Sequence, residues 1–136
     1  MSAEFKGRRE DFRLVTGQGR YTSDWNFPKQ TYGFFLRSDR PHAKIKSIDT
    51  AAAKAAPGVI TVLTGTDTAN IAALPQMLAI PGRDGNKIIP TGRDVLAVER
   101  VRFVGQGLAF VVAETLDQAM DASELIEIDF EDLDFI

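Results

Sequence analysis

His42 is the only histidine in this 136-residue chain, so it is the first residue to consider for acid–base or metal chemistry. A metal site would need two or more histidine or cysteine ligands, and because the chain has no cysteine, only carboxylates could join His42. Since His42 follows the turn residues Asp39, Arg40 and Pro41, we expect it to be a surface or packing residue. A nucleophile–histidine–acid triad assembles in space and stays open, although no serine has the setting of a nucleophile elbow.

Two Gly-Gln-Gly sequences, at residues 17–19 and 105–107, are similar to parts of phosphate-binding loops. A dinucleotide-binding loop needs a third glycine and lies between a strand and a helix, so that the helix N-terminus faces the phosphates. Neither sequence has the third glycine, and residues 105–107 lead into an apolar strand. We expect a turn or a bulge at both places.

Charged residues offer two further candidate sites, and each has a simpler explanation. Four arginines could form an anion-binding face if their strands are neighbours, although surface solvation is the better interpretation: Arg37, Arg40, Arg100 and Arg102. In the acidic segment 124–134, alternation places Glu127 and Asp129 on the wet face of a strand. Paired catalytic carboxylates remain an alternative there without other support.

The composition is that of an ordinary globular domain, with 44% hydrophobic and 26% charged residues. The net charge of −3 without a long block of either sign gives no footprint for nucleic acid and no polybasic membrane anchor. No apolar run approaches the ~20 residues that span a bilayer. The polar N-terminal residues lack the pattern of a targeting signal, so we expect a cytoplasmic protein.

The stretch from Val101 to Glu114 is the expected centre of the fold. Val101 and Phe103 alternate with arginines, which predicts a strand with one buried face. Residues 108–113 form an unbroken apolar run, which indicates a strand covered on both faces. Thr115 and Gln118 then have the spacing of a capping box, and one face of the following helix gathers apolar and small residues: Leu116, Ala119, Met120, Ser123 and Ile126.

The other elements follow from alternation and breakers. Residues 31–38 and 43–48 are predicted strands whose short turn favours an antiparallel pair, and Gly33 marks a bulge or a close approach. Asp49 can cap a helix over residues 50–56 that Pro57 and Gly58 end. We also expect strands at 59–64, 95–98 and 127–130, with loops over 65–93 and one short extended or helical piece at 77–80.

Together these elements predict one α+β domain over residues 1–136, a mixed sheet with two main helices packed on it. Residues 1–30 form an N-terminal arm packed on the domain, with Tyr21, Trp25 and Phe27 as its anchors. A ferredoxin-like sandwich is the generic match, but the extra N-terminal strand and the long middle insertion fit it poorly. No catalytic constellation emerges from the residues.

Several short phrases occur in order along nearly the whole chain. They are Arg9-Glu10-Asp11, Arg13-Leu14-Val15-Thr16-Gly17, Gly19-Arg20-Tyr21, Phe35-Leu36-Arg37-Ser38, His42-Ala43-Lys44-Ile45, Ile48-Asp49, Ala56-Pro57-Gly58-Val59, Val101-Arg102-Phe103-Val104-Gly105, Ala109-Phe110-Val111-Val112-Ala113-Glu114-Thr115, Ala119 with Asp121-Ala122, and Phe130-Glu131-Asp132-Leu133. In this order and spacing they resemble the N-terminal α/β-hammerhead domain of the molybdenum-binding large subunit of the xanthine dehydrogenase, aldehyde oxidase and carbon monoxide dehydrogenase family.

The resemblance implies an α/β-hammerhead fold without catalytic machinery of its own. In such enzymes the active-site glutamate and the cofactor-contacting loops belong to later domains, so no catalytic, cofactor-binding or metal-binding residue is assigned here. The molybdopterin cofactor is expected only in a partner chain. Gln106-Gly107 replaces the family's usual acidic residue and proline, and Asp134-Phe135 replaces its proline-containing exit. Both departures lie in segments where a hammerhead meets its neighbours.

Two functions follow as hypotheses. The first is a non-catalytic hammerhead domain or split subunit of a molybdenum hydroxylase-like oxidoreductase, acting with a separate molybdopterin-binding large subunit. The second is a free-standing binding or structural module derived from that domain, self-associating as a homo-oligomer through exposed apolar surface. An independent enzyme is the least favoured, and neither nucleic acid nor membrane is expected as a partner. The sequence does not decide whether Gln106 has a role.

Overall fold

The computed structural model describes residues 7–8, 10–74 and 92–134 of the chain. Contacts divide the chain into two compact units, Met1–Gln30 and Thr31–Ile136. The predicted piece at residues 77–80 lies outside the described residues. No helix in the described part is long and apolar enough to cross a membrane.

The N-terminal unit contains two short helices, α1 (Asp11–Val15) and η1 (Thr22–Asp24). The Asp11 carboxylate accepts a hydrogen bond from the Arg8 amide at 2.8 Å. Gly17 follows α1 with a φ of 71°, which confirms the turn predicted at residues 17–19. The packing of this arm on the domain, with its aromatic anchors, stays a prediction.

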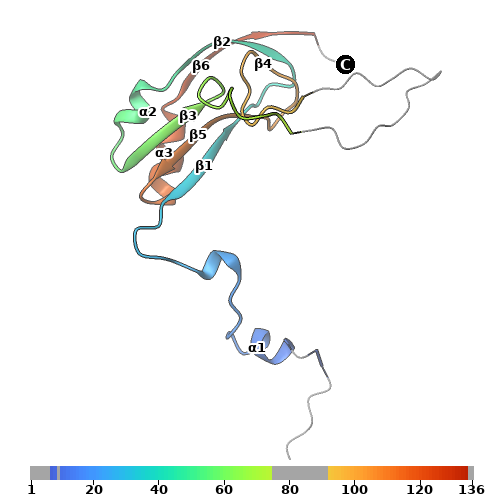
Figure 1. Cartoon of the computed structure of the whole chain (residues 1–136), viewed down its shortest axis with the longest axis vertical. Coiled ribbons are helices and arrows are strands. Elements are labelled where there is room, and N and C mark those ends of the chain that lie inside the picture. Colours follow the sequence, from blue (N-terminus) through green and yellow to red (C-terminus); the bar gives the residue numbers. More distant parts are fainter. Residues whose placement is uncertain (1–6, 9, 75–91, 135–136) are drawn as a thin grey trace, which may run out of the picture. The chain divides into compact units, whose positions relative to one another are not determined.

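The strands of the second unit form two three-stranded antiparallel sheets (Figure 1). The first sheet has the order β1 (Tyr32–Arg37), β5 (Gly107–Ala113), β3 (Val59–Thr64), and the second has the order β4 (Arg100–Val101), β2 (Ala43–Asp49), β6 (Glu127–Asp132). Helices α2 (Ala51–Ala55) and α3 (Leu116–Glu124) pack against strands of the first sheet. The α+β class is confirmed, although the strands divide between two antiparallel sheets instead of forming one mixed sheet.

The predicted pairing of residues 31–38 with 43–48 is wrong, although both segments are strands. β1 pairs with β5, and β2 pairs with β4 and β6. The intervening turn carries the chain from one sheet to the other, and Ser38 stabilises it because its hydroxyl accepts a hydrogen bond from the Arg40 amide at 2.9 Å. Alternation of apolar and polar residues identifies the buried face of a strand but not the strand with which it pairs.

Two predictions between residues 95 and 103 are also wrong. Residues 95–98 form no strand: Leu96 and Ala97 are buried, and the Ala97 amide donates to the Gly107 carbonyl at 2.8 Å. Val101 is buried as expected, but β4 ends there and Phe103 is 54% exposed because the chain turns. An apolar pattern indicates burial, and the residues of an irregular segment can be buried as well as those of a strand.

β5 is fully covered on one face and only partly covered on the other, so the prediction of a strand covered on both faces is confirmed in part. Ala109, Val111 and Ala113 point into the core that includes residues of α2 and α3, and Leu108 points into a second core with Val101. On that second face the rings of Phe110 and Phe35 lie 4.5 Å apart. The Phe110 ring also lies against Gly33, where an added Cβ would come within 2.3 Å of it. The predicted close approach to the Gly33 backbone is therefore confirmed.

Helix α3 begins with the predicted capping box. The Thr115 hydroxyl accepts from the Gln118 amide at 3.2 Å, and the Gln118 side chain accepts from the Thr115 amide at 3.0 Å. Ala119 and Ser123 face the sheet as expected, but Leu116 and Met120 are 44% and 43% exposed. The helix packs through small side chains, including Ala122, and this close packing turns the larger residues towards the surface.

The predicted helix after residue 49 is also present, as α2. The Asp49 carboxylate accepts a hydrogen bond from the Ala51 amide at 2.8 Å. Gly58 lies beyond the helix with a φ of 76°, and a Cβ there would meet the Gln118 side chain at 2.3 Å. Gly58 therefore supplies both the left-handed backbone and the space that brings α2 and α3 together.

The turn after β3 contains a carboxyl group, that of Asp67, whose pKa departs from its ordinary value. The Asp67 carboxylate accepts hydrogen bonds from the Thr64 amide and the Thr64 hydroxyl, both at 2.8 Å. These bonds, chiefly the one from the backbone amide, lower the pKa of Asp67. The ionised carboxylate therefore stabilises this turn.

We expect Thr115→Ala to lower the free energy of unfolding by about 1 kcal/mol, because the substitution removes the acceptor for the Gln118 amide. Urea denaturation followed by circular dichroism measures the change. Thr66→Ala is the matched control, since Thr66 is exposed. Equal losses in both variants would contradict a specific capping role.

We expect Asp67→Asn to destabilise the chain near neutral pH and to lose this effect on acidification. Because the pKa is lowered in the folded state, the carboxylate stabilises the fold above its unfolded pKa of about 4. This contribution disappears as the pH falls through the lowered folded pKa. Urea denaturation over a pH series tests this, with the exposed Asp121→Asn as control; a deficit that does not change with pH would refute it.

Candidate functional site

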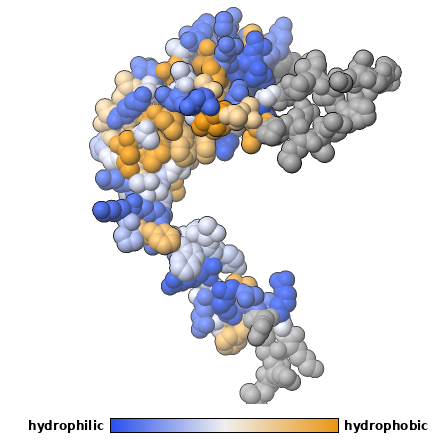
Figure 2. Space-filling model, in the orientation of Figure 1, coloured by the Kyte–Doolittle hydropathy of each residue, from blue (hydrophilic) through white to orange (hydrophobic). Residues whose placement is uncertain are grey.

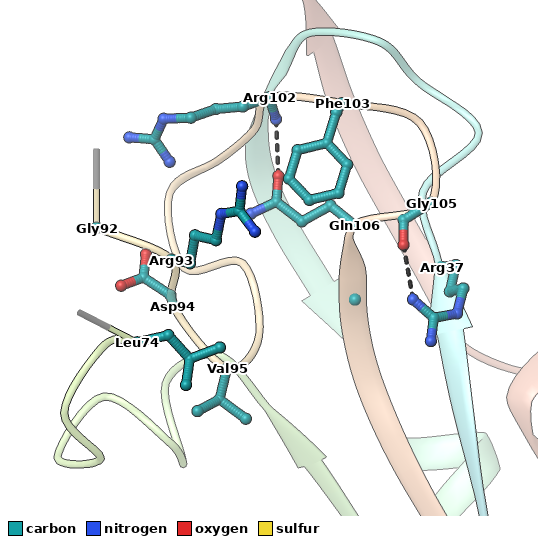
Figure 3. A pocket seen from close by; sticks show the side chains of 11 residues that line it. Arg37, Leu74, Gly92, Arg93, Asp94, Val95, Arg102, Phe103, Gly105 and Gln106 are labelled. Carbon is teal, nitrogen blue, oxygen red and sulfur yellow. Dashed lines mark hydrogen bonds between the residues drawn. The ribbon is translucent and has the colours of Figure 1, made fainter. Parts of the chain in front are cut away.

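A cleft of about 420 Å³ lies at the start of β5 (Figure 3). Segments distant in sequence line it: the end of β1, Leu74, residues 92–95, and the turn at 102–107. Leu74 is held there by a bridge to Arg93, in which the Leu74 amide donates to the Arg93 carbonyl at 3.0 Å. The cleft is thus a product of the tertiary fold.

Gln106 organises the turn that forms one wall of the cleft. Its side-chain oxygen accepts a hydrogen bond from the Arg102 amide at 2.8 Å, and its carbonyl accepts one from the Ser38 amide at 2.9 Å. Gly105 has a φ of 89°, and its amide donates to the Ser38 carbonyl at 2.7 Å. The turn predicted at residues 105–107 is confirmed, and Gln106 has a structural role in it.

Three arginines and one aspartate are among the described residues that line the cleft: Arg37, Arg93, Arg102 and Asp94. Arg37 donates to the Gly105 carbonyl at 2.8 Å, which fixes its position against the turn. In Figure 3 the side chain of Arg93 points towards the turn that holds Gln106. The cleft therefore carries an excess of positive charge in a chain whose net charge is −3.

The predicted face of four arginines is brought together only in part. Arg37 and Arg102 share the cleft, and Arg102 also lines a smaller hollow of about 160 Å³ together with Arg100. Arg40 lies elsewhere, 3.4 Å from the Asp132 carboxylate and over the Phe130 ring. The sequence interpretation missed Arg93, because its place depends on the bridge to Leu74, for which the sequence carries no local signal.

His42 is a packing residue, as predicted. Its Nδ1 lies 2.8 Å from the Asp134 carbonyl, and since a carbonyl only accepts, Nδ1 carries the proton. The His42 carbonyl in turn accepts from the Leu133 amide at 3.0 Å. Among the described residues, no three His, Asp or Glu side chains gather closely enough to hold a metal ion.

The acidic strand β6 has the wet face that alternation predicts. Glu127, Asp129 and Glu131 are exposed, while Ile128 and Phe130 are half-buried between them. This is an ordinary solvated edge, and its acidic side chains help to keep an edge strand from pairing with other chains.

Comparison with known proteins gives one consistent result. Residues 16–134 match the family described as "Aldehyde oxidase and xanthine dehydrogenase, a/b hammerhead domain". The chain is 43% identical over 126 residues to the carbon monoxide dehydrogenase large chain of Afipia carboxidovorans, covering 93% of this chain and 14% of the relative. It is 36% identical over 130 residues to the nicotine 6-hydroxylase large subunit of Paenarthrobacter nicotinovorans, covering 95% of this chain and 15% of that subunit.

A solved structure shows the same similarity. Quinoline 2-oxidoreductase from Pseudomonas putida 86 matches with a TM-score of 0.85 and 39% identity, covering 93% of this chain and 16% of the other. The chain therefore spans only about a seventh of the length of the curated relatives it matches.

We expect Gln106→Met to lower the free energy of unfolding by about 1–2 kcal/mol, because the Arg102 amide loses the partly buried acceptor that the Gln106 side chain provides. Gln106→Glu keeps an acceptor oxygen at the same place and should retain most of the stability. Urea denaturation of both variants measures the difference, and the amide NMR signal of Arg102 reports the bond directly. Equal stability of both variants would show that the bond does not organise the turn.

Proposed function

Because the chain belongs to the aldehyde oxidase and xanthine dehydrogenase a/b hammerhead domain family, we propose that it is a non-catalytic part of a molybdenum hydroxylase-like oxidoreductase. The observation that carries this proposal is a match over residues 16–134 to relatives of which the chain spans only about a seventh. In the proposed assembly, the cofactor and the substrate pocket belong to the much longer remainder of the enzyme.

The internal chemistry of the chain supports a non-catalytic role. The side chains best suited to catalysis are already bonded within the fold: His42 to the Asp134 carbonyl and Gln106 to the Arg102 amide. The chain also lacks cysteine, so it offers no thiolate to a metal. We therefore assign it no molybdopterin ligand and propose that the cofactor is held by the molybdopterin-binding polypeptide.

The role we propose is to cover and orient the cofactor-binding part. β5 is buried on one face and partly buried on the other, and its preceding turn is closed by hydrogen bonds, so the domain can present a rigid surface. A rigid surface binds without the cost of ordering loops.

A self-associating module is the second candidate, and exposed apolar side chains favour it. Leu74, Phe103 and Val104 are 66%, 54% and 62% exposed, and Figure 2 shows apolar atoms on the surface of this unit. Such residues usually find a partner, which could be a second copy of the chain.

A chimaera tests the proposed function. In the Afipia carboxidovorans carbon monoxide dehydrogenase large chain, residues 16–134 of this protein would replace the segment they match. We expect the chimaera to fold and to retain molybdenum at about the stoichiometry of the parent, because the replacement keeps the hammerhead fold and its surface. Elemental analysis of the purified protein measures this.

A large chain from which the matched segment is deleted serves as the control and should lose its metal. A folded chimaera without molybdenum would contradict the proposal. A metal-free homo-oligomer of the chain on its own, together with a failed chimaera, would favour the self-associating module.

A further inference from the structure

We propose that the cleft at the start of β5 is a docking site for a segment of the partner polypeptide that carries carboxylates beside an apolar side chain. This inference rests on the proposed function, because the partner is the molybdopterin-binding part of the enzyme. We call the three guanidinium groups of Arg37, Arg93 and Arg102 the arginine cluster.

Charge is the first argument. Among the described residues that line the cleft, Asp94 is the only acidic one beside the three residues of the arginine cluster. The ion pairs between described residues involve Arg8, Arg13 and Arg40, so they leave Arg93 and Arg102 available. A planar guanidinium donates two parallel hydrogen bonds to a carboxylate, which makes arginine suited to recognise acidic side chains.

Apolar surface in the same cleft is the second argument. Leu74, Val95 and Phe103 line it, and they are 66%, 42% and 54% exposed. Figure 3 shows Leu74 and Val95 side by side below Arg93. Single exposed apolar residues need no explanation, but several around one concave site mark a binding surface.

Preorganisation is the third argument. The Gln106 side chain holds the Arg102 amide, and the Gly105 carbonyl holds the Arg37 side chain. Docking would therefore not have to order this wall of the cleft, and more of the contact energy would remain for affinity.

Two other occupants fit the charge less well. Residues 75–91 of the chain carry Arg83 and Lys87 but only one acid, Asp84, so they do not complement a positive cleft. The acidic strand β6 of a second copy has the right charge, but this contact would join two different surfaces. Such head-to-tail contacts build rings or open filaments rather than closed dimers. A partner polypeptide avoids this difficulty.

Nuclear magnetic resonance of the full chain tests the cleft directly. The probe is the peptide acetyl-Ala-Asp-Phe-Glu-Ala-amide, titrated at a mildly acidic pH at which its carboxylates are still ionised. We expect the side-chain Nε–H signals of Arg93 and Arg102 to shift with saturation, while that of Arg40 does not. The matched neutral peptide, with Asn and Gln in place of the acids, should give no saturable shift.

Variants measure the contribution of the arginine cluster. We expect Arg93→Gln combined with Arg102→Gln to weaken binding of the acidic peptide about tenfold, and Arg40→Gln, which removes one positive charge outside the cleft, to change it less than twofold. Equal shifts with the neutral peptide or with inorganic phosphate alone, or equal losses in both variants, would overturn the proposal. Peptide-independent self-association that the double variant abolishes would assign the cleft to a second copy instead.

The same substitutions in the chimaera separate this inference from the proposed function. If the chimaera holds molybdenum and the double variant destabilises its domain interface, both stand. If the chimaera holds molybdenum and the double variant has the thermal stability of the Arg40→Gln control, the docking site is refuted while the proposed function stands. Failure of the unsubstituted chimaera refutes the proposed function, and the peptide titration still decides the specificity of the cleft.

Discussion

The position of β5 between two hydrophobic cores is the constraint on which the rest of the second unit depends. Its odd-numbered side chains, such as Val111, enter the core under the helices, and Leu108 enters the second core beside Val101. β5 is also the central strand of the first sheet and pairs with both edge strands, β1 and β3. One strand thus links the two cores and orders the first sheet. The residues before it must turn sharply, because Arg100 and Val101 belong to the second sheet.

The sequence was informative where a signal is local. The capping box at Thr115 and Gln118 lies within one turn of helix, and the apolar run of β5 shows directly in residue types. The pairing of β1 was not predictable in this way, since Phe35 meets Phe110 across a separation of 75 positions that no short pattern encodes. Leu116 was misplaced for a related reason: the helical wheel weighs hydrophobicity, whereas the sheet selected the small residues Ala119 and Ala122 for close packing.

Less of the candidate site than of the fold could be predicted from the sequence. Arg37 and Arg102 were noticed as charges, but Arg93 joins them only through the bridge at Leu74. Gln106 lies between two glycines, a pattern that predicts a turn or a bulge but not the partner of the side chain. Its actual bond, to the amide of Arg102 four residues earlier, depends on the left-handed Gly105 between them. The family, by contrast, was recognised from phrases spread over nearly the whole chain, and the match over residues 16–134 confirms it.

The turn at residues 102–107 connects the stability of the domain with the surface it presents. Its inward groups are used by the fold: the Gln106 side-chain oxygen accepts from the Arg102 amide, and the Gly105 amide donates to the Ser38 carbonyl. Its outward side chains, Arg102 and Phe103, are left for contact. The hydrogen bond between the Gln106 side chain and the Arg102 amide closes the turn and also fixes the backbone of Arg102. The buried Gln106 side chain therefore sets the position of the exposed Arg102 guanidinium. A domain without catalytic groups can influence an enzyme in this way, by holding a binding surface in one geometry.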